Sequence, residues 1–174
     1  MTRRGFTLLE MCIVLAVVAL ATTLAVVSLR GVHQKIRGEN VQQLIRGFDA
    51  KGRRWAHTRG QAVDLVFDIN AQTLGVHSQN PDEPPVPLEP VRLPLGFELV
   101  AVITARGEST AREVRLPCSP LGTTPSYAVR FKPADGPPRE LLFAGLTGNT
   151  HEVRDPQQSQ QVFERLRQTG LDPD

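Results

Sequence analysis

Apolar residues dominate the start of the chain, where the pattern has the length of a membrane helix. Residues 11–29 form an apolar run that only Thr22, Thr23 and Ser28 interrupt. As a helix, this run spans about 28 Å at 1.5 Å per residue, close to the ~30 Å hydrocarbon core of a bilayer. The run therefore predicts a transmembrane helix over residues 6–30.

An amphipathic pattern follows the apolar run. Apolar side chains lie three, four, seven and fourteen positions after Val41, which places all five on one face of a helix: Val41, Leu44, Ile45, Phe48 and Trp55. Four glycines, each costing about 1 kcal/mol relative to Ala, weaken the helical pattern: Gly31, Gly38, Gly47 and Gly52. They permit either close packing or a bend. We expect an amphipathic helical stem over residues 31–60.

Beyond residue 60 the pattern becomes typical of short strands. Alternating or β-branched segments separated by turn residues occur at 62–68, 73–77, 96–105, 113–116, 127–132 and 140–144. The proline-dense segment 81–94 predicts an exposed loop, because proline lacks the donor that a sheet requires. Residues 157–169 can form a short terminal helix. The fold class predicted is α+β: a long N-terminal helix, membrane-spanning in its first half, packed against an antiparallel β-rich head at 61–174.

Charge is distributed unevenly between the stem and the head. Residues 30–60 carry a net charge of about +6, whereas residues 61–174 carry about −5. Five basic residues of the stem could neutralise phosphates, with Trp55 as a stacking surface: Arg46, Lys51, Arg53, Arg54 and Arg59. The alternative, which the acidic head favours, is that these charges are solvated or meet the acidic heads of neighbouring subunits.

The N-terminus combines basic residues, an acid and the apolar run. Arg3 and Arg4, followed by the run and a small-residue site at 19–21, would suit a secretory signal peptide. Glu10 and the continuation of the run beyond residue 21 count against that interpretation. No Lys or Arg lies within the run, and an acid at this depth is costly. Glu10 therefore either reaches the lipid headgroups or finds a counter-charge elsewhere.

The sequence from Arg3 to Glu10, Arg-Arg-Gly-Phe-Thr-Leu-Leu-Glu, resembles the leader and mature N-terminus of type IV pilins and type II secretion pseudopilins. The resemblance implies that residues 1–5 are a prepilin leader, that a prepilin peptidase cuts after Gly5, and that the new N-terminal Phe6 is methylated. It also assigns filament assembly to Glu10. An opposite charge within a few ångströms would offset the cost of burying either the Glu10 carboxylate or the Phe6 amine of a neighbouring subunit.

The order of elements in the head is similar to that of the GspH/FimT-like minor subunits. The similarity is greatest over residues 44–68 and looser over 127–149. The chain departs from the wider family because its apolar run contains no proline. Whether the helix bends is therefore open.

No pattern in the chain indicates catalysis. The four histidines lack metal-ligand spacing and no CxxC pair is present. Cys12 and Cys118 are expected to be free thiols, since one lies in the apolar run and the other far along the head. We therefore expect no enzyme, cofactor or metal site.

The combined prediction is a minor pseudopilin of a type II secretion system, a structural subunit of a periplasmic filament. The resemblance places it in the bacterial inner membrane as a single-pass protein, with a cytoplasmic N-terminus and a periplasmic head. Its expected partners are the prepilin peptidase, other pilin or pseudopilin subunits and inner-membrane lipid. The alternatives are a minor type IV pilin that binds DNA during uptake, and a membrane protein that never polymerises.

Overall fold

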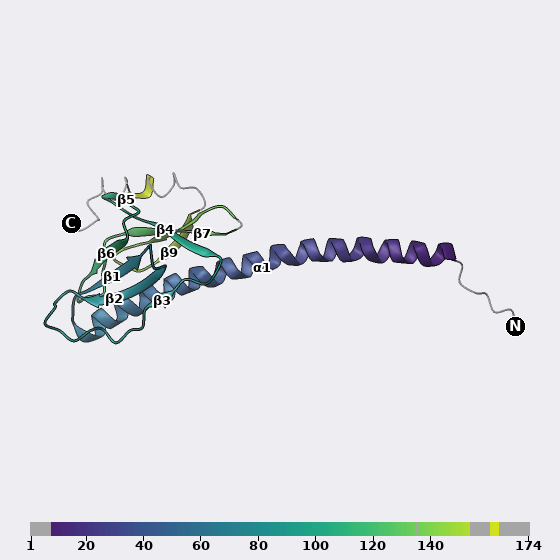
Figure 1. Cartoon of the computed structure of the whole chain (residues 1–174). Helices are drawn as coiled ribbons and strands as arrows, with labels where there is room; N and C mark the ends of the chain where they lie inside the picture. Colours follow the sequence, from purple (N-terminus) through teal and green to yellow (C-terminus); the bar gives the residue numbers. More distant parts are fainter. Residues whose placement is uncertain (1–7, 135, 154–160, 164–174) are drawn as a thin grey trace. The chain divides into compact units, whose positions relative to one another are not determined.

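The computed structural model describes residues 8–134, 136–153 and 161–163, and for residues 24–37 it describes the backbone alone. The chain divides into two compact units, Met1–Asn40 and Val41–Asp174. The helix α1 (Leu8–Arg59) is followed by these strands (Figure 1): β1 (Val63–Asp68), β2 (Thr73–Ser78), β3 (Val91–Arg92), β4 (Phe97–Thr104), β5 (Gly107–Ser109), β6 (Glu113–Cys118), β7 (Tyr127–Pro133), β8 (Arg139–Phe143) and β9 (Thr150–Val153).

The predicted transmembrane helix at 6–30 is wrong. Nowhere in the described part of the chain is a helix both long and apolar enough to cross a membrane. The membrane-spanning first half of the predicted fold, and the single-pass inner-membrane location that depended on it, are corrected accordingly.

Two antiparallel sheets make up the strand region of the second unit. One has the order β3-β2-β1-β6 and the other the order β5-β4-β7-β8-β9. In the first sheet β1 is central, with Leu65 opposite Val76 of β2 and Leu116 of β6. In the second, β7 lies between β4 and β8. The α+β class with antiparallel sheets therefore describes this unit.

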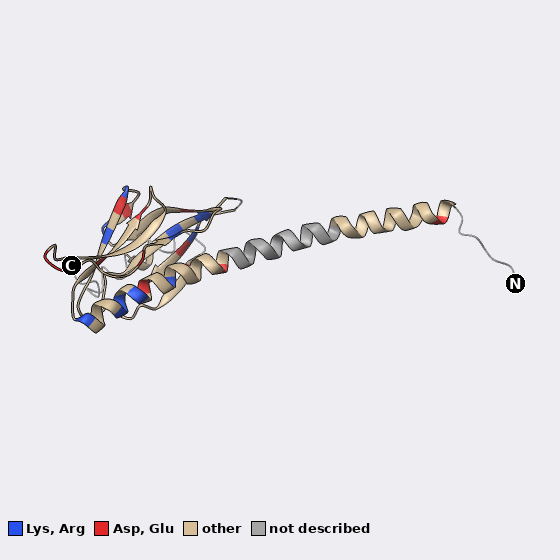
Figure 2. Ribbon diagram, turned by 60° about the horizontal axis from the view of Figure 1, so that its bottom comes forward, with Lys and Arg blue, Asp and Glu red and all other residues tan. Residues whose placement is uncertain are grey.

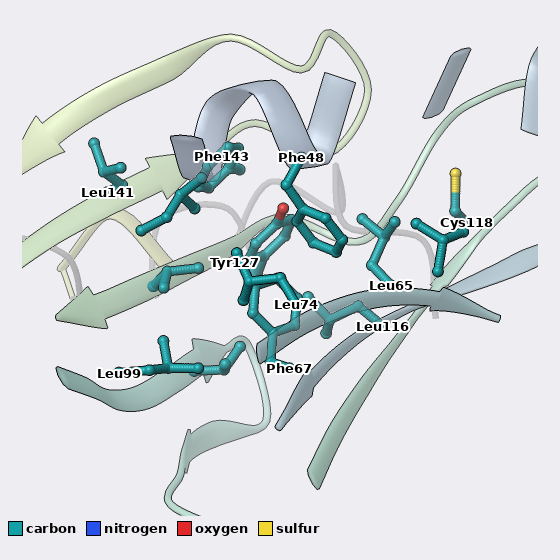
Figure 3. Close-up of a cluster of buried hydrophobic side chains, with 14 of the residues drawn as sticks. Phe48, Leu65, Phe67, Leu74, Leu99, Leu116, Cys118, Tyr127, Leu141 and Phe143 are labelled. Atoms are coloured by element: carbon teal, nitrogen blue, oxygen red, sulfur yellow. The ribbon is translucent and has the colours of Figure 1, made fainter. Parts of the chain in front are cut away.

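The main core lies between the two sheets and the C-terminal part of α1. Alternate residues of β7 point into it, as a period of two requires: Tyr127, Val129 and Phe131 are fully buried. Figure 3 shows Phe48 of α1 in this core together with Phe67 and Tyr127, and the ring centroids of Phe48 and Phe67 are 5.6 Å apart, edge to face. Burying aromatic side chains in this way contributes strongly to the stability of the unit.

Two of the helix glycines have different surroundings. A Cβ at Gly52 would lie 2.4 Å from Cδ2 of the buried Leu65, so the absence of a side chain lets α1 approach β1 closely. A Cβ at Gly47 would meet nothing within 4 Å. Close packing is therefore the role of Gly52, while nothing in the structure requires glycine at position 47.

The opposite face of the second sheet carries a smaller cluster. Ile103, Ala128, Leu142 and Val153 pack there with Phe163. Residues 161–163 are helical, and the rest of the helix predicted for 157–169 lies outside the described residues. Beside this cluster, the Arg130 guanidinium donates to the buried carboxylate of Glu140 at 2.6 Å, and it also pairs with Glu108.

Candidate functional site

The N-terminal residues to which the resemblance gives a role are only partly described. Gly5 and Phe6 lie outside the described residues. Glu10 lies in the first turn of α1 and is exposed. A carboxylate there is favourable, because the helix dipole places partial positive charge at its N-terminus.

The first turns of α1 carry a continuous apolar surface. All described side chains from residue 8 to residue 23 are exposed. Leu8 is 84% exposed, Leu15 65% and Leu20 67%, and the other large side chains of this segment are about half exposed or more. An apolar surface that is contiguous and exposed marks a site of interaction.

The five basic candidates for nucleic-acid contact are not equally accessible. Lys and Arg gather toward the end of α1 (Figure 2), where Lys51, Arg54 and Arg59 are exposed. Arg46 is half-buried and Arg53 is buried. Trp55, expected to be a stacking surface, is partly buried against the main core.

A buried ionic cluster joins α1 to the strand region. The Arg53 Nε–H donates to Asp49 Oδ2 at 2.7 Å, one helical turn away. The Tyr127 hydroxyl donates to the other carboxylate oxygen of Asp49, also at 2.7 Å. Tyr127 is fully buried, and Asp49 and Arg53 are nearly so. Because each charge is paired and hydrogen-bonded, the cluster avoids the cost of an isolated buried ion.

The rest of the Arg53 guanidinium is bound by two loops. Nη1–H donates to the carbonyl of Gly145 at 2.5 Å, and Nη2–H donates to the Thr124 hydroxyl at 2.6 Å. A Cβ at Gly145 would lie 2.1 Å from the Thr124 carbonyl oxygen, so only glycine allows the two loops to meet there. Arg53 thus fixes two loops against one side of the helix, although Thr124 and Gly145 lie 21 positions apart in the sequence.

Burial and the Asp49 carboxylate change the titration of two neighbouring groups. Burial, together with the charge and hydrogen bond of Asp49, raises the pKa of Tyr127 well above its usual value. Burial also raises the pKa of the Cys118 thiol to about 11, with Arg53 opposing the shift and Asp49 adding to it. Both groups are therefore uncharged at neutral pH.

A cleft of about 320 Å³ lies where the same loops approach the end of α1. Arg53, Arg54 and His57 line it from the helix. Leu121, Leu146 and Gly148 line it from the loops. Gly122 and Gly148 have positive φ angles, 77° and 69°, which allow the loops to turn back toward the helix.

The described residues offer no arrangement suited to metal binding. No group of three or more His, Cys, Asp or Glu side chains in this part of the chain could hold a metal ion. His57, His77 and His151 are exposed and lie on different elements. Cys12 and Cys118 are free, as predicted.

The buried cluster was missed from the sequence, although a signal was present. Asp49 follows Ile45 by four residues and Arg53 follows Asp49 by four, so both charges border the apolar face of the helix. Charged residues at such positions are rarely buried unless they are paired. Tyr127 could not have been assigned to the cluster, because its contact with Asp49 is made across 78 positions of sequence.

Searches against protein-family models, curated proteins and solved structures found no match for this chain.

Proposed function

We propose that this chain is a subunit of a type IV pilin-like filament, a minor pseudopilin of a type II secretion system. A prepilin peptidase removes residues 1–5, and the new N-terminal Phe6 is methylated. The subunit then acts structurally, by binding other subunits. The observation that carries the proposal is the register of Gly5, Phe6 and Glu10 ahead of an apolar segment.

The exposed apolar surface of α1 supports this proposal. Side chains such as Leu9, at 71% exposure, and Val17, at 62%, find no cover in the described part of their own unit. Packing such surfaces between the helices of several subunits would remove them from water, at roughly 25 cal/mol per Å² buried. A filament subunit whose helices bundle together provides that cover.

Glu10 gives the bundle its register. In a low-dielectric helix bundle, a carboxylate and an amine stabilise each other when they lie within a few ångströms. The amine that cleavage creates at Phe6 lies four residues from Glu10 in sequence, about 6 Å along a helix axis at 1.5 Å per residue. A modest axial offset between neighbouring helices would therefore bring the Glu10 carboxylate of one subunit to the Phe6 amine of the next.

The test is co-expression with a prepilin peptidase, followed by mass measurement of the N-terminal peptide. We expect a peptide that begins with N-methylated Phe6. The Gly5→Leu variant should keep its leader, whereas Thr7→Ala, the matched control on the other side of the cut, should be processed normally. An intact Met1 leader on the unaltered chain would contradict the proposal.

Assembly is tested separately in chains that mature normally. Glu10→Leu keeps the apolar surface but removes the charge, so it should enter filaments far less than the unaltered chain does. Equal incorporation of Glu10→Leu would contradict the role of the carboxylate. Loss of secretion in a deletion strain, with twitching retained, would assign the subunit to the secretion machine rather than to a pilus.

A further inference from the structure

The bottom of the cleft at the end of α1 is formed by a buried, charge-paired arginine. The Arg53 guanidinium lies there, and it is held by Asp49, by the Gly145 carbonyl and by Thr124. A Cβ on Gly148 would be 3.6 Å from Cδ of Arg53, so the loop rests directly on the arginine side chain. The cleft is therefore already formed in the folded unit, because the buried contacts of Arg53 hold the helix and the loops together.

The walls of the cleft combine positive charge with exposed leucine. Arg54 and His57 are exposed on the helix side. Leu121 is 77% exposed and Leu146 58% exposed on the loop side. Among the described residues from 41 onward, the large apolar side chains that are mostly exposed are these two and Leu95. Two of the three thus lie at one cleft, where they contribute little to the core.

The fold itself accounts for only part of this arrangement. Basic residues in the last turn, His57 and Arg59, complement the negative end of the helix dipole. That effect falls off within the last turn, so it does not explain Arg54. Nor does it explain the exposure of Leu121 and Leu146 on two separate loops. A surface with these features is complementary to a ligand that carries both a carboxylate and an apolar side chain.

A nucleic acid fits the cleft less well. Its helix side offers Arg54 and His57 as accessible basic groups, while Arg53 is paired internally with Asp49. No aromatic side chain of the described residues lines it. Binding to a phosphate backbone depends on several Lys or Arg contacts and is commonly helped by aromatic stacking. Exposed leucines favour an apolar side chain instead.

We propose that this cleft binds an acidic segment of a partner protein. A Glu or Asp carboxylate of that segment pairs with Arg54 and His57, and a neighbouring apolar side chain lies between Leu121 and Leu146. A volume of about 320 Å³ is at the small end of the range for ligand sites, ~300–1,000 Å³, so it accommodates one or two side chains. This inference does not depend on processing at Gly5.

The experiment uses the full chain and a fluorescein-labelled peptide of alternating glutamate and leucine, with binding measured by fluorescence anisotropy. We expect saturable binding that weakens as salt is added. Arg54→Glu and Leu121→Ser should each weaken binding roughly tenfold or more, as loss of an interface anchor commonly does. Lys51→Glu is the matched control, because Lys51 is exposed on the same helix but does not line the cleft, and it should change binding less than about twofold.

A second peptide of alternating lysine and leucine controls for binding to the apolar start of α1, and it should not compete. Equal urea midpoints for the variants would show that they fold. The proposal is overturned if Arg54→Glu and Leu121→Ser bind as the unaltered chain does. It is overturned in favour of a nucleic acid if single-stranded DNA displaces the acidic peptide and loses affinity equally on Arg54→Glu.

Discussion

Residues 8–23 and residues 41–56 belong to the same helix and are both rich in apolar side chains, yet their surroundings differ. In the first segment every described side chain is exposed. In the second, Val41, Ile45 and Ala56 are fully buried against two sheets. The apolar pattern of the second segment is explained by this chain's own fold. The described part of the chain does not cover the first segment, which the proposed function assigns to contacts with other subunits.

The two segments also use charge differently. Glu10 is an exposed acid in the first turn of the helix, whereas Asp49 is buried and bonded to Arg53 and Tyr127. Each acid accompanies an apolar face. Asp49 fixes α1 against Tyr127 within one chain, and the proposed function gives Glu10 a corresponding role between chains.

The largest effect is expected when the counter-charge of the buried Asp49 is removed. Arg53→Met leaves the Asp49 carboxylate buried without its cation and should lower the free energy of unfolding by about 3–5 kcal/mol. Urea unfolding followed by the fluorescence of Trp55, the single tryptophan, measures this. Arg54→Met, at the neighbouring exposed position, is the control and should cost less than about 1 kcal/mol. An equal loss of unfolding free energy in the two variants would mean that the buried Arg53–Asp49 pair contributes no more to stability than an exposed arginine does.

The next effect is a loss of stability at alkaline pH. The folded state holds the pKa of the Cys118 thiol at about 11, above its ordinary value of 9.0. Stability from this group is therefore complete below pH 9 and is lost as pH rises toward 11, because the unfolded chain releases the proton first. The loss is on the order of 2 kcal/mol.

Urea midpoints measured between pH 8 and pH 11 test this. Cys118→Ala should show a shallower decline than the unaltered chain, while Tyr127, whose raised pKa acts in the same direction, continues to contribute. Cys12 is exposed, so Cys12→Ala serves as the control and should leave the decline unchanged. An identical pH dependence in all three chains would refute the assignment to Cys118.

A smaller effect separates two glycines of the same helix. Gly52→Ala forces the buried Leu65 side chain to move and should cost about 1–3 kcal/mol. Gly47→Ala meets no atom within 4 Å and should stabilise the helix by up to about 1 kcal/mol. Opposite signs in thermal unfolding would confirm the close approach of α1 to β1. A stabilising Gly52→Ala would refute it.

Local patterns were enough to predict much of the second unit. Alternation over 127–132 and 140–144 located β7 and β8 to within one residue, because each strand has a buried face with a period of two. The strands β3, β5 and β9 were missed. They are short, and their pairing depends on neighbours that are distant in sequence. The transmembrane prediction was wrong, since no helix in the described part of the chain is both long and apolar enough to cross a membrane.

The candidate site was harder to predict than the fold. A count of Lys and Arg grouped Arg53 with Arg54, although one is buried and the other exposed. Their difference follows from the helix period, which turns Arg53 toward Asp49 and the loops at Thr124 and Gly145. No local pattern brings those loops together. The cleft that they form with α1 was therefore beyond sequence analysis.

The smallest effect on stability is expected in the exposed segment, residues 8–23. Leu15→Ala shortens a side chain that is 65% exposed. It should change the free energy of unfolding, measured in urea by the fluorescence of Trp55, by less than about 0.5 kcal/mol. The same truncation at the fully buried Ile45 costs about 2–5 kcal/mol. Self-association should respond in the opposite order, since only Leu15 lies on the surface proposed to meet other subunits. Sedimentation of the processed chain measures this. If Leu15→Ala lowered the stability of the second unit as Ile45→Ala does, the segment would have a partner within its own chain, and other subunits would not be needed to cover it.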